Sequence, residues 1–105
     1  MLKTKYMSTD DPDIYLEQLA KALAATKDPK LLLDFLHSIL TPNEISEIAT
    51  RWALVMRIYD GKSQRKIAEE LGVSLCKITR GSKELKKENS PFKKMIEKWK
   101  EVSGK

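Results

Sequence analysis

The sequence predicts an all-α fold, a six-helix chain with a helix-turn-helix that forms an intimate homodimer. Three observations support this prediction: regularly placed helix-start signals, two helices that are apolar around most of their circumference, and a segment with helix-turn-helix spacing. No segment shows the sustained alternation of apolar and polar residues that is typical of a strand. The expected helices span about residues 12–26, 29–39, 42–59, 64–71, 75–87 and 91–102.

Proline marks four of the expected helix starts. Each follows a residue that can cap a helix: Asp11-Pro12, Asp28-Pro29, Thr41-Pro42 and Ser90-Pro91. Proline suits the first helical position because the amide hydrogen that it lacks would have no partner there. Thr41 and Glu44 also fit the reciprocal capping-box pattern, and Gly61 is expected to end the third helix.

The second and third helices are apolar on nearly every side. Their apolar residues are Leu31, Leu32, Leu33, Phe35, Leu36, Ile39 and Leu40, then Ile45, Ile48, Ala49, Trp52, Ala53, Val55, Met56, Ile58 and Tyr59. Such helices must be buried on more than one side, and a chain of 105 residues has little mass to enclose both. A second copy would cover them, which favours a homodimer. The alternative is a compact monomer with a broad core.

The helix-turn-helix lies within residues 64–81. Apolar residues stand at Ile67, Leu71, Val73 and Ile78, and the small Ala68 lies where two helices must approach closely. Two further residues complete the pattern. Gly72 can take the left-handed conformation that ends the first helix, and Ser74 can cap the second. In such motifs the second helix enters the major groove of DNA.

Charge and composition agree with a nucleic-acid partner. The net charge is +5, but residues 1–60 sum to −2 and residues 61–105 to +7, so the basic half begins at the motif. We expect a flexible arm at 1–10 and one helical DNA-binding domain at 11–105, with the helix-turn-helix at about 64–87. The single Cys76 favours a reducing, cytoplasmic compartment. No membrane span or secretion signal is evident.

Helical spacing predicts which side chains of the motif face DNA. Those expected to face outward are Cys76, Thr79, Arg80 and Lys83, with Leu75 at the tip, Gln64 and Arg65 at the start of the motif, and Lys86 near its end. Small side chains allow close approach to base edges, and the basic ones suit phosphates. Gly81 has two open explanations, a close helix crossing or a flat ligand against the backbone, where Arg80 could clamp a carboxylate or phosphate.

Several short segments resemble the tryptophan-operon repressor family. They are Leu40-Thr41-Pro42-Asn43-Glu44, Thr50-Arg51, Ser63-Gln64-Arg65, Ile78-Thr79-Arg80-Gly81-Ser82 and Leu85-Lys86. The resemblance covers about residues 31–87, and more loosely the rest. It implies a six-helical, intertwined homodimer that binds operator DNA when L-tryptophan is bound as corepressor.

The same resemblance implies roles for particular residues. The indole would lie between Arg80 and Arg51 of the partner subunit, with Gly81 leaving room for the ring. Leu40, Thr41 and Val55 would line the site, and carbonyls from Ile39 to Thr41 would receive the ammonium. The positions that match DNA contacts are Gln64, Arg65, Leu75, Cys76, Thr79 and Lys86, with Thr50 at a phosphate.

Three departures from the better-known members bear on these roles, and one of them is Ser38, which replaces a leucine near the pocket wall. Glu84 replaces a serine that helps hold the ammonium of the ligand, and a carboxylate there could pair with the ammonium or repel the ligand's carboxylate. The loop Gly61-Lys62-Ser63 is one residue shorter, so the first helix of the motif could enter at a different angle.

Three functions therefore remain open. The first is a sequence-specific transcriptional repressor activated by L-tryptophan, and the second is a regulator of the same fold that needs no corepressor. The third is the DNA-binding subunit of a transposase. An enzyme is not expected, because His37 stands on an apolar helix, and no phosphate-binding glycine loop or metal-ligand spacing appears. No catalytic residue, metal or cofactor is predicted.

Overall fold

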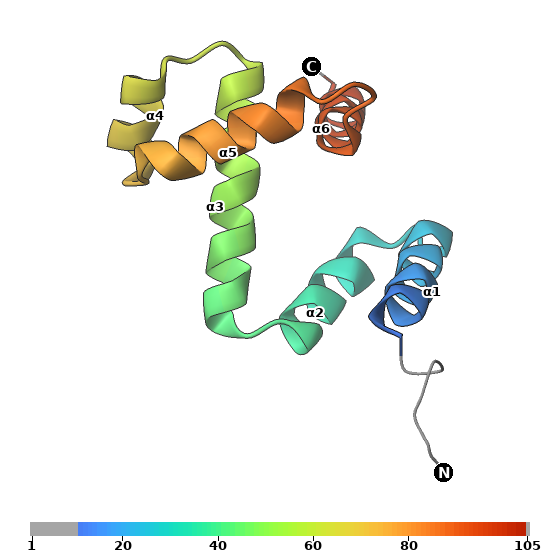
Figure 1. Ribbon diagram of the computed structural model, residues 1–105. Helices are drawn as coiled ribbons and strands as arrows, with labels where there is room; N and C mark the ends of the chain where they lie inside the picture. Colours follow the sequence, from blue (N-terminus) through green and yellow to red (C-terminus); the bar gives the residue numbers. More distant parts are fainter. Residues whose placement is uncertain (1–10, 105) are drawn as a thin grey trace. The chain divides into compact units, whose positions relative to one another are not determined.

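The computed structural model describes residues 11–104, and this part of the chain is entirely helical (Figure 1). Its helices are α1 (Pro12–Ala25), α2 (Pro29–Ile39), α3 (Pro42–Tyr59), α4 (Gln64–Leu71), α5 (Leu75–Lys86) and α6 (Pro91–Val102). The all-α, six-helix prediction is confirmed. Two predicted ends were one residue too long, because Thr26 and Lys87 already have extended backbones. The arm predicted at 1–10 lies outside the described residues.

Side-chain caps explain where most of the helices begin. The side chain of the preceding residue accepts a backbone amide hydrogen at α1, α2, α4, α5 and α6, from Asp11, Asp28, Ser63, Ser74 and Ser90 respectively. These bonds satisfy amides that have no partner inside the helix. The prolines of α1, α2 and α6 occupy the first turn, and α3 begins at Pro42, as predicted.

The end of α3 is fixed by its own backbone. Gly61 has a φ of 89°, and its amide donates to the carbonyl of Ile58 at 3.0 Å. The amide of Lys62 donates to the carbonyl of Arg57 at 3.0 Å. These two bonds form the closing pattern that a left-handed glycine allows, so the turn into α4 is well defined, and Gly61 ends the helix as predicted.

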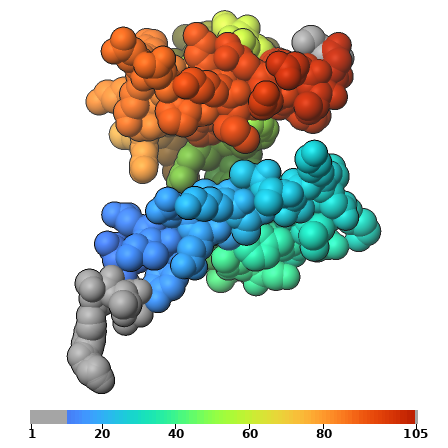
Figure 2. Space-filling model, turned by 90° about the vertical axis from the view of Figure 1, so that its right-hand side faces the viewer, coloured from blue at the N-terminus to red at the C-terminus, as the bar shows by residue number. Residues whose placement is uncertain are grey.

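The chain divides into two compact units, residues 1–41 and 42–105, and each is described by itself. In the first unit, α1 and α2 have no buried residue. Its exposed apolar side chains include Ile14, Tyr15, Leu16, Leu31, Leu33, Leu36 and Ile39. These two helices are the blue-to-cyan part of the space-filling view (Figure 2). Residues 11–41 of the first unit therefore have no fully enclosed core of their own.

The second unit has a continuous core where α3, α4, α5 and α6 meet. Its buried apolar residues are at most 2% exposed: Leu54, Val55, Ile67, Ile78 and Ile96. Trp52 stacks on Phe92 with ring centroids 5.8 Å apart, which joins α3 to α6, and Lys100 pairs with Asp60 at 2.9 Å. This core holds the helix-turn-helix on α3, so that α5 crosses α3 (Figure 1).

Candidate nucleic-acid interface

Helices α4 and α5 form the predicted helix-turn-helix. Gly72 ends α4 with φ 64° and ψ 32°, and its amide donates to the carbonyl of Ala68 at 2.9 Å. Ser74 then caps α5 by accepting the amide hydrogen of Lys77 at 3.3 Å. The sequence places a glycine where a left-handed residue is required and a hydroxyl where an amide needs a partner. Both predictions are confirmed.

The inner face of the motif is apolar and closed. Ile67 of α4 and Ile78 of α5 are completely buried, and Ala68, Leu71 and Val73 pack against them. Burial of this face fixes which side of α5 is left for solvent, so the rest of the helix forms the outer face.

The outer face carries most of the predicted DNA-contacting residues. The exposed ones are Gln64, Arg65, Leu75, Cys76, Thr79, Arg80, Lys83 and Lys86, whereas Thr50 of α3 is half-buried. Leu75 is 58% exposed at the first position of α5. More than half of this apolar side chain is therefore accessible to a partner.

The cations of this face are not neutralised by neighbouring carboxylates. Within residues 11–104, the predicted DNA-contacting cations, Arg65, Arg80, Lys83 and Lys86, form no ion pair. Phosphate binding requires cations that can exchange counterions for phosphates. The face therefore retains its positive charge for a polyanion.

The residues expected to bind a corepressor fall into both units. Arg80 and Arg51 are exposed, Val55 is completely buried, and Glu84 is half-buried and pairs with Lys87 at 2.9 Å. Ile39, Leu40 and Thr41 belong to the first unit, where Ile39 is 51% exposed. The structure thus brings Val55 together with Gly81.

Gly81 is explained by the crossing of α5 over α3. A β-carbon on this buried glycine would lie 2.5 Å from Leu54 Cδ2 and 3.2 Å from Val55 Cγ2. A larger residue would require the buried side chain of Leu54 to move or the two helices to separate. Of the two explanations left open by the sequence, the close helix crossing is present.

Two features of the second unit were not predicted. The carboxylate of Glu70 pairs with Arg57 at 2.8 Å and with Lys62 at 2.7 Å, and these hydrogen bonds lower the pKa of Glu70 to about 2, with Lys62 contributing most. No spacing rule links three charges in a helix, a loop and another helix.

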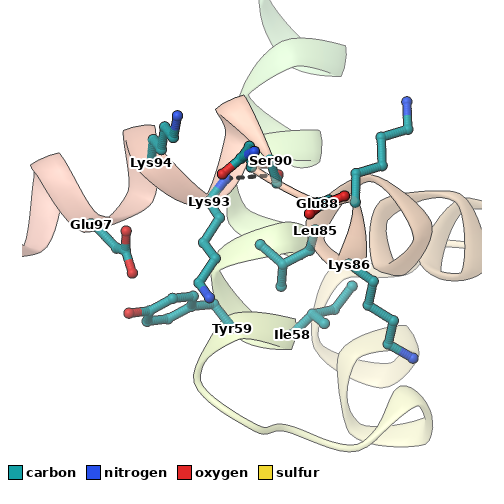
Figure 3. Close-up of a pocket in the computed structure, with 11 residues that line it drawn as sticks. Ile58, Tyr59, Leu85, Lys86, Glu88, Ser90, Lys93, Lys94 and Glu97 are labelled. Carbon is teal, nitrogen blue, oxygen red and sulfur yellow. Dashed lines mark hydrogen bonds between the residues drawn. The ribbon is translucent and has the colours of Figure 1, made fainter.

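The second unpredicted feature is an open groove between the ends of α3 and α5 and the start of α6 (Figure 3). Ile58 and Leu85 contribute its apolar wall, and Lys86, Lys93 and Glu97 are among its charged lining residues. The nearby Ser90 is only 2% exposed and caps α6. The charged residues that line the groove are four lysines and two glutamates, so its net charge is positive.

Other kinds of site are not found in the described part of the chain. Between residues 11 and 104, no three His, Cys, Asp or Glu side chains are grouped so that they could hold a metal ion. No helix there is sufficiently long and apolar to cross a membrane. Cys76 is exposed and has a free thiol.

Comparison with known proteins gives a consistent result. A family model described as "Trp repressor protein" matches residues 15–100. A Trp operon repressor homolog of Chlamydia trachomatis serovar L2 is 37% identical over 70 residues, which cover 66% of this chain and 74% of the relative. The homolog of Photobacterium profundum is 35% identical over 82 residues, covering 77% and 76%. That of Xylella fastidiosa strain M23 is 40% identical over 81 residues, covering 70% and 80%.

Proposed function

Because this chain belongs to the Trp repressor family, we propose that it is a DNA-binding transcriptional repressor that recognises its operator through the outer face of α4 and α5. The observation that carries the proposal is the combination of a closed apolar inner face with an outer face of unpaired cations. The family membership points to the same activity.

Helix α5 is the element that would enter the major groove. Leu75, Cys76 and Thr79 would approach base edges, because their side chains are exposed and short enough to let the helix come close. Phosphates would be bound by Gln64, Arg65, Lys83 and Lys86, with Thr50 at the edge of the contact. Arg80 would serve both the DNA and the corepressor.

The repressor would act as a homodimer. Helices α1 and α2 leave large apolar side chains exposed, among them Leu16 at 64% and Leu33 at 56%. Helix α6 does the same with Met95 at 58% and Val102 at 75%. A second copy of the chain is the partner that would cover these faces. The dimer would then present two helix-turn-helix motifs to a two-fold symmetric operator.

L-Tryptophan is the proposed corepressor. Arg80 and Arg51 of the partner subunit would hold the indole, and Glu84 would approach the ammonium group after release from Lys87. The remaining walls would come from Gly81, Val55, Leu40, Thr41 and Ile39. Bound ligand would shift the population of α4 and α5 toward the orientation that fits DNA.

One observation favours a second candidate, a regulator of the same fold that needs no corepressor. Side chains of Leu54 and Val55 already cover Gly81, so the space beside this glycine is occupied by the protein itself. The two candidates differ only in whether ligand changes the affinity for DNA.

Selection from randomised duplexes tests the proposal. The purified chain is incubated with the pool, with and without millimolar L-tryptophan, and retained duplexes are sequenced. We expect a two-fold symmetric motif that is enriched with tryptophan; enrichment that is equal without it would favour the second candidate. Retention of unrelated sequences only would contradict sequence-specific binding.

A further inference from the structure

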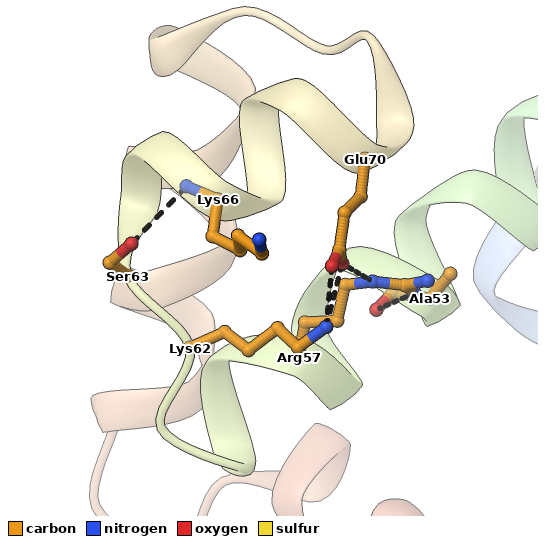
Figure 4. Close-up of polar contacts among 6 residues, drawn as sticks. All are labelled: Ala53, Arg57, Lys62, Ser63, Lys66 and Glu70. Carbon is orange, nitrogen blue, oxygen red and sulfur yellow. Dashed lines mark hydrogen bonds and ion pairs between the residues drawn. The ribbon is translucent and has the colours of Figure 1, made fainter.

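The carboxylate of Glu70 joins three segments of the second unit (Figure 4). Glu70 lies on α4 and accepts a hydrogen bond from Arg57 Nε of α3 at 2.8 Å. Lys62 Nζ, in the loop between these helices, donates to both carboxylate oxygens at 2.8 and 2.7 Å. One side chain of α4 is thus fixed to the helix and the loop that precede it.

Both donors are themselves held by α3. Arg57 Nη1 donates to the carbonyl of Ala53 at 3.3 Å, and the backbone amide of Lys62 donates to the carbonyl of Arg57. The three side chains are only 28–42% exposed. A carboxylate shared by two cations is held more rigidly than an isolated surface pair.

Helix α4 needs such a fixed point because its apolar contacts are few. It has eight residues, and Ile67 is the only one of them that is buried. Ala68 and Leu71 pack against the same core but are only partly buried. The carboxylate of Glu70 lies nearly one turn away from Ile67 along the helix and adds a polar contact to these apolar ones.

We propose that Glu70 is a positioning residue for DNA binding, which sets the orientation of α4, and through it α5, without touching DNA. The inference rests on the proposed function, since it assumes that α4 and α5 bind DNA. It also means that Lys62, although it stands next to the exposed start of α4, is held by Glu70 and is not free to bind phosphates.

Positioning and net charge predict opposite effects when Glu70 is replaced. Loss of a negative charge strengthens the attraction of any protein for DNA, whereas loss of orientation weakens binding to a specific sequence. Glu69 supplies the matched control: it is the neighbouring residue on α4, it is exposed, and it forms no ion pair among residues 11–104. Glu70→Gln and Glu69→Gln therefore change net charge equally.

Two measurements on the full chain test the proposal. Native-state hydrogen exchange without DNA should show amides of α4 exchanging about three- to tenfold faster in Glu70→Gln and unchanged in Glu69→Gln. Fluorescence anisotropy then compares a selected duplex with a scrambled one at a single salt concentration. Glu70→Gln should bind the selected duplex at least about threefold more weakly, and Glu69→Gln equally or more tightly.

Three results would overturn the inference. Equal exchange in both variants would show that Glu70 does not fix α4, and equal changes in affinity would show that only its charge matters. If the wild type selects no duplex, the proposed function fails, and the role of Glu70 in DNA binding fails with it. Hydrogen exchange would then still show whether Glu70 fixes α4. If Glu70→Gln does not fold, the same exchange and affinity measurements are made on Lys62→Gln, with Lys66→Gln as its control.

Discussion

The two units of the chain use similar helical apolar patterns but bury them to different extents. Residues 42–104 enclose five apolar side chains that are at most 2% exposed. Helices α1 and α2 bury none, although eleven of their residues are large and apolar. The larger unit, which contains the helix-turn-helix, therefore has a core of its own. The smaller unit has apolar faces that its own described residues do not cover, as expected if they form the interface of the proposed homodimer.

The largest effect is expected from a charge placed on an apolar face of the smaller unit. Leu33→Glu places a charge on an apolar face of α2 that is 56% exposed in one chain. In a homodimer the charge would be buried twice by symmetry, which would weaken association by about 6 kcal/mol. Sedimentation equilibrium should show monomers. His37→Glu, on the same helix, is the control, and a Leu33→Glu protein that remains as associated as the wild type would contradict the dimer.

A smaller effect is expected in the core of the larger unit. Ile78→Ala removes a completely buried side chain of α5 and should lower the free energy of unfolding by about 3 kcal/mol. Urea denaturation measures this loss. Leu75→Ala, on the exposed tip of the same helix, should leave the unfolding midpoint unchanged and weaken only DNA binding. The reverse pattern would mean that the two faces of α5 have been exchanged.

The next effect on stability is expected at Gly81, where α5 crosses α3. Gly81→Ala adds a β-carbon 2.5 Å from Leu54 Cδ2, and we expect a loss of about 1–3 kcal/mol in the ligand-free protein, measured by thermal unfolding. Ser82→Ala, one residue along, serves as the control. An unchanged stability of Gly81→Ala would argue that the space beside this glycine is kept for a ligand.

Two arginines of the larger unit are proposed to link DNA binding to the corepressor. Arg80→Ala should abolish the effect of L-tryptophan on DNA binding, because a charge-assisted contact contributes about 1.5–3 kcal/mol. Arg51→Ala should weaken tryptophan binding in calorimetry by about tenfold or more. Arg65→Ala is the control, since it should weaken DNA binding without changing the heat of tryptophan binding. Unchanged affinity for L-tryptophan in both arginine variants would contradict the proposed corepressor site.

The smallest effect concerns the pH dependence of stability. The pKa of Glu70 is lowered to about 2 from an ordinary value near 4.5. Its ion pairs therefore stabilise the folded state fully above pH 4.5, and this contribution is lost as the pH falls toward 2. The difference in Tm between the wild type and Glu70→Gln should be largest near neutral pH and shrink in acid. A difference that does not change with pH would assign the effect to packing alone.

The sequence was sufficient for the fold because its signals are local. Proline after a capping residue, Gly61 and Gly72 each act within one turn of helix, and all six helices were located within one residue of their ends. The buried face of the motif followed from periodicity for the same reason. Gly81 could not be resolved in advance, since its reason is the distance to Leu54 in another helix.

The site was less predictable because it depends on contacts between elements. The exposure of Leu75, Thr79 and Lys83 follows from helical spacing. The pairing of Glu70 with Arg57 and Lys62 joins residues 13 and 8 positions apart and has no periodic signature. Whether α3 and α5 leave space for a ligand depends on side-chain packing, and in a dimer on the partner subunit, which no single-chain pattern reports.

L-Tryptophan is proposed to control the binding of the outer face of α4 and α5 to a specific DNA sequence. The most direct test is a fluorescence anisotropy titration of the selected duplex with the wild-type chain, with and without saturating L-tryptophan, beside a scrambled duplex. We expect tryptophan to lower the Kd for the selected duplex at least about tenfold and to leave the Kd for the scrambled duplex unchanged. Equal Kd values with and without tryptophan would contradict this proposal.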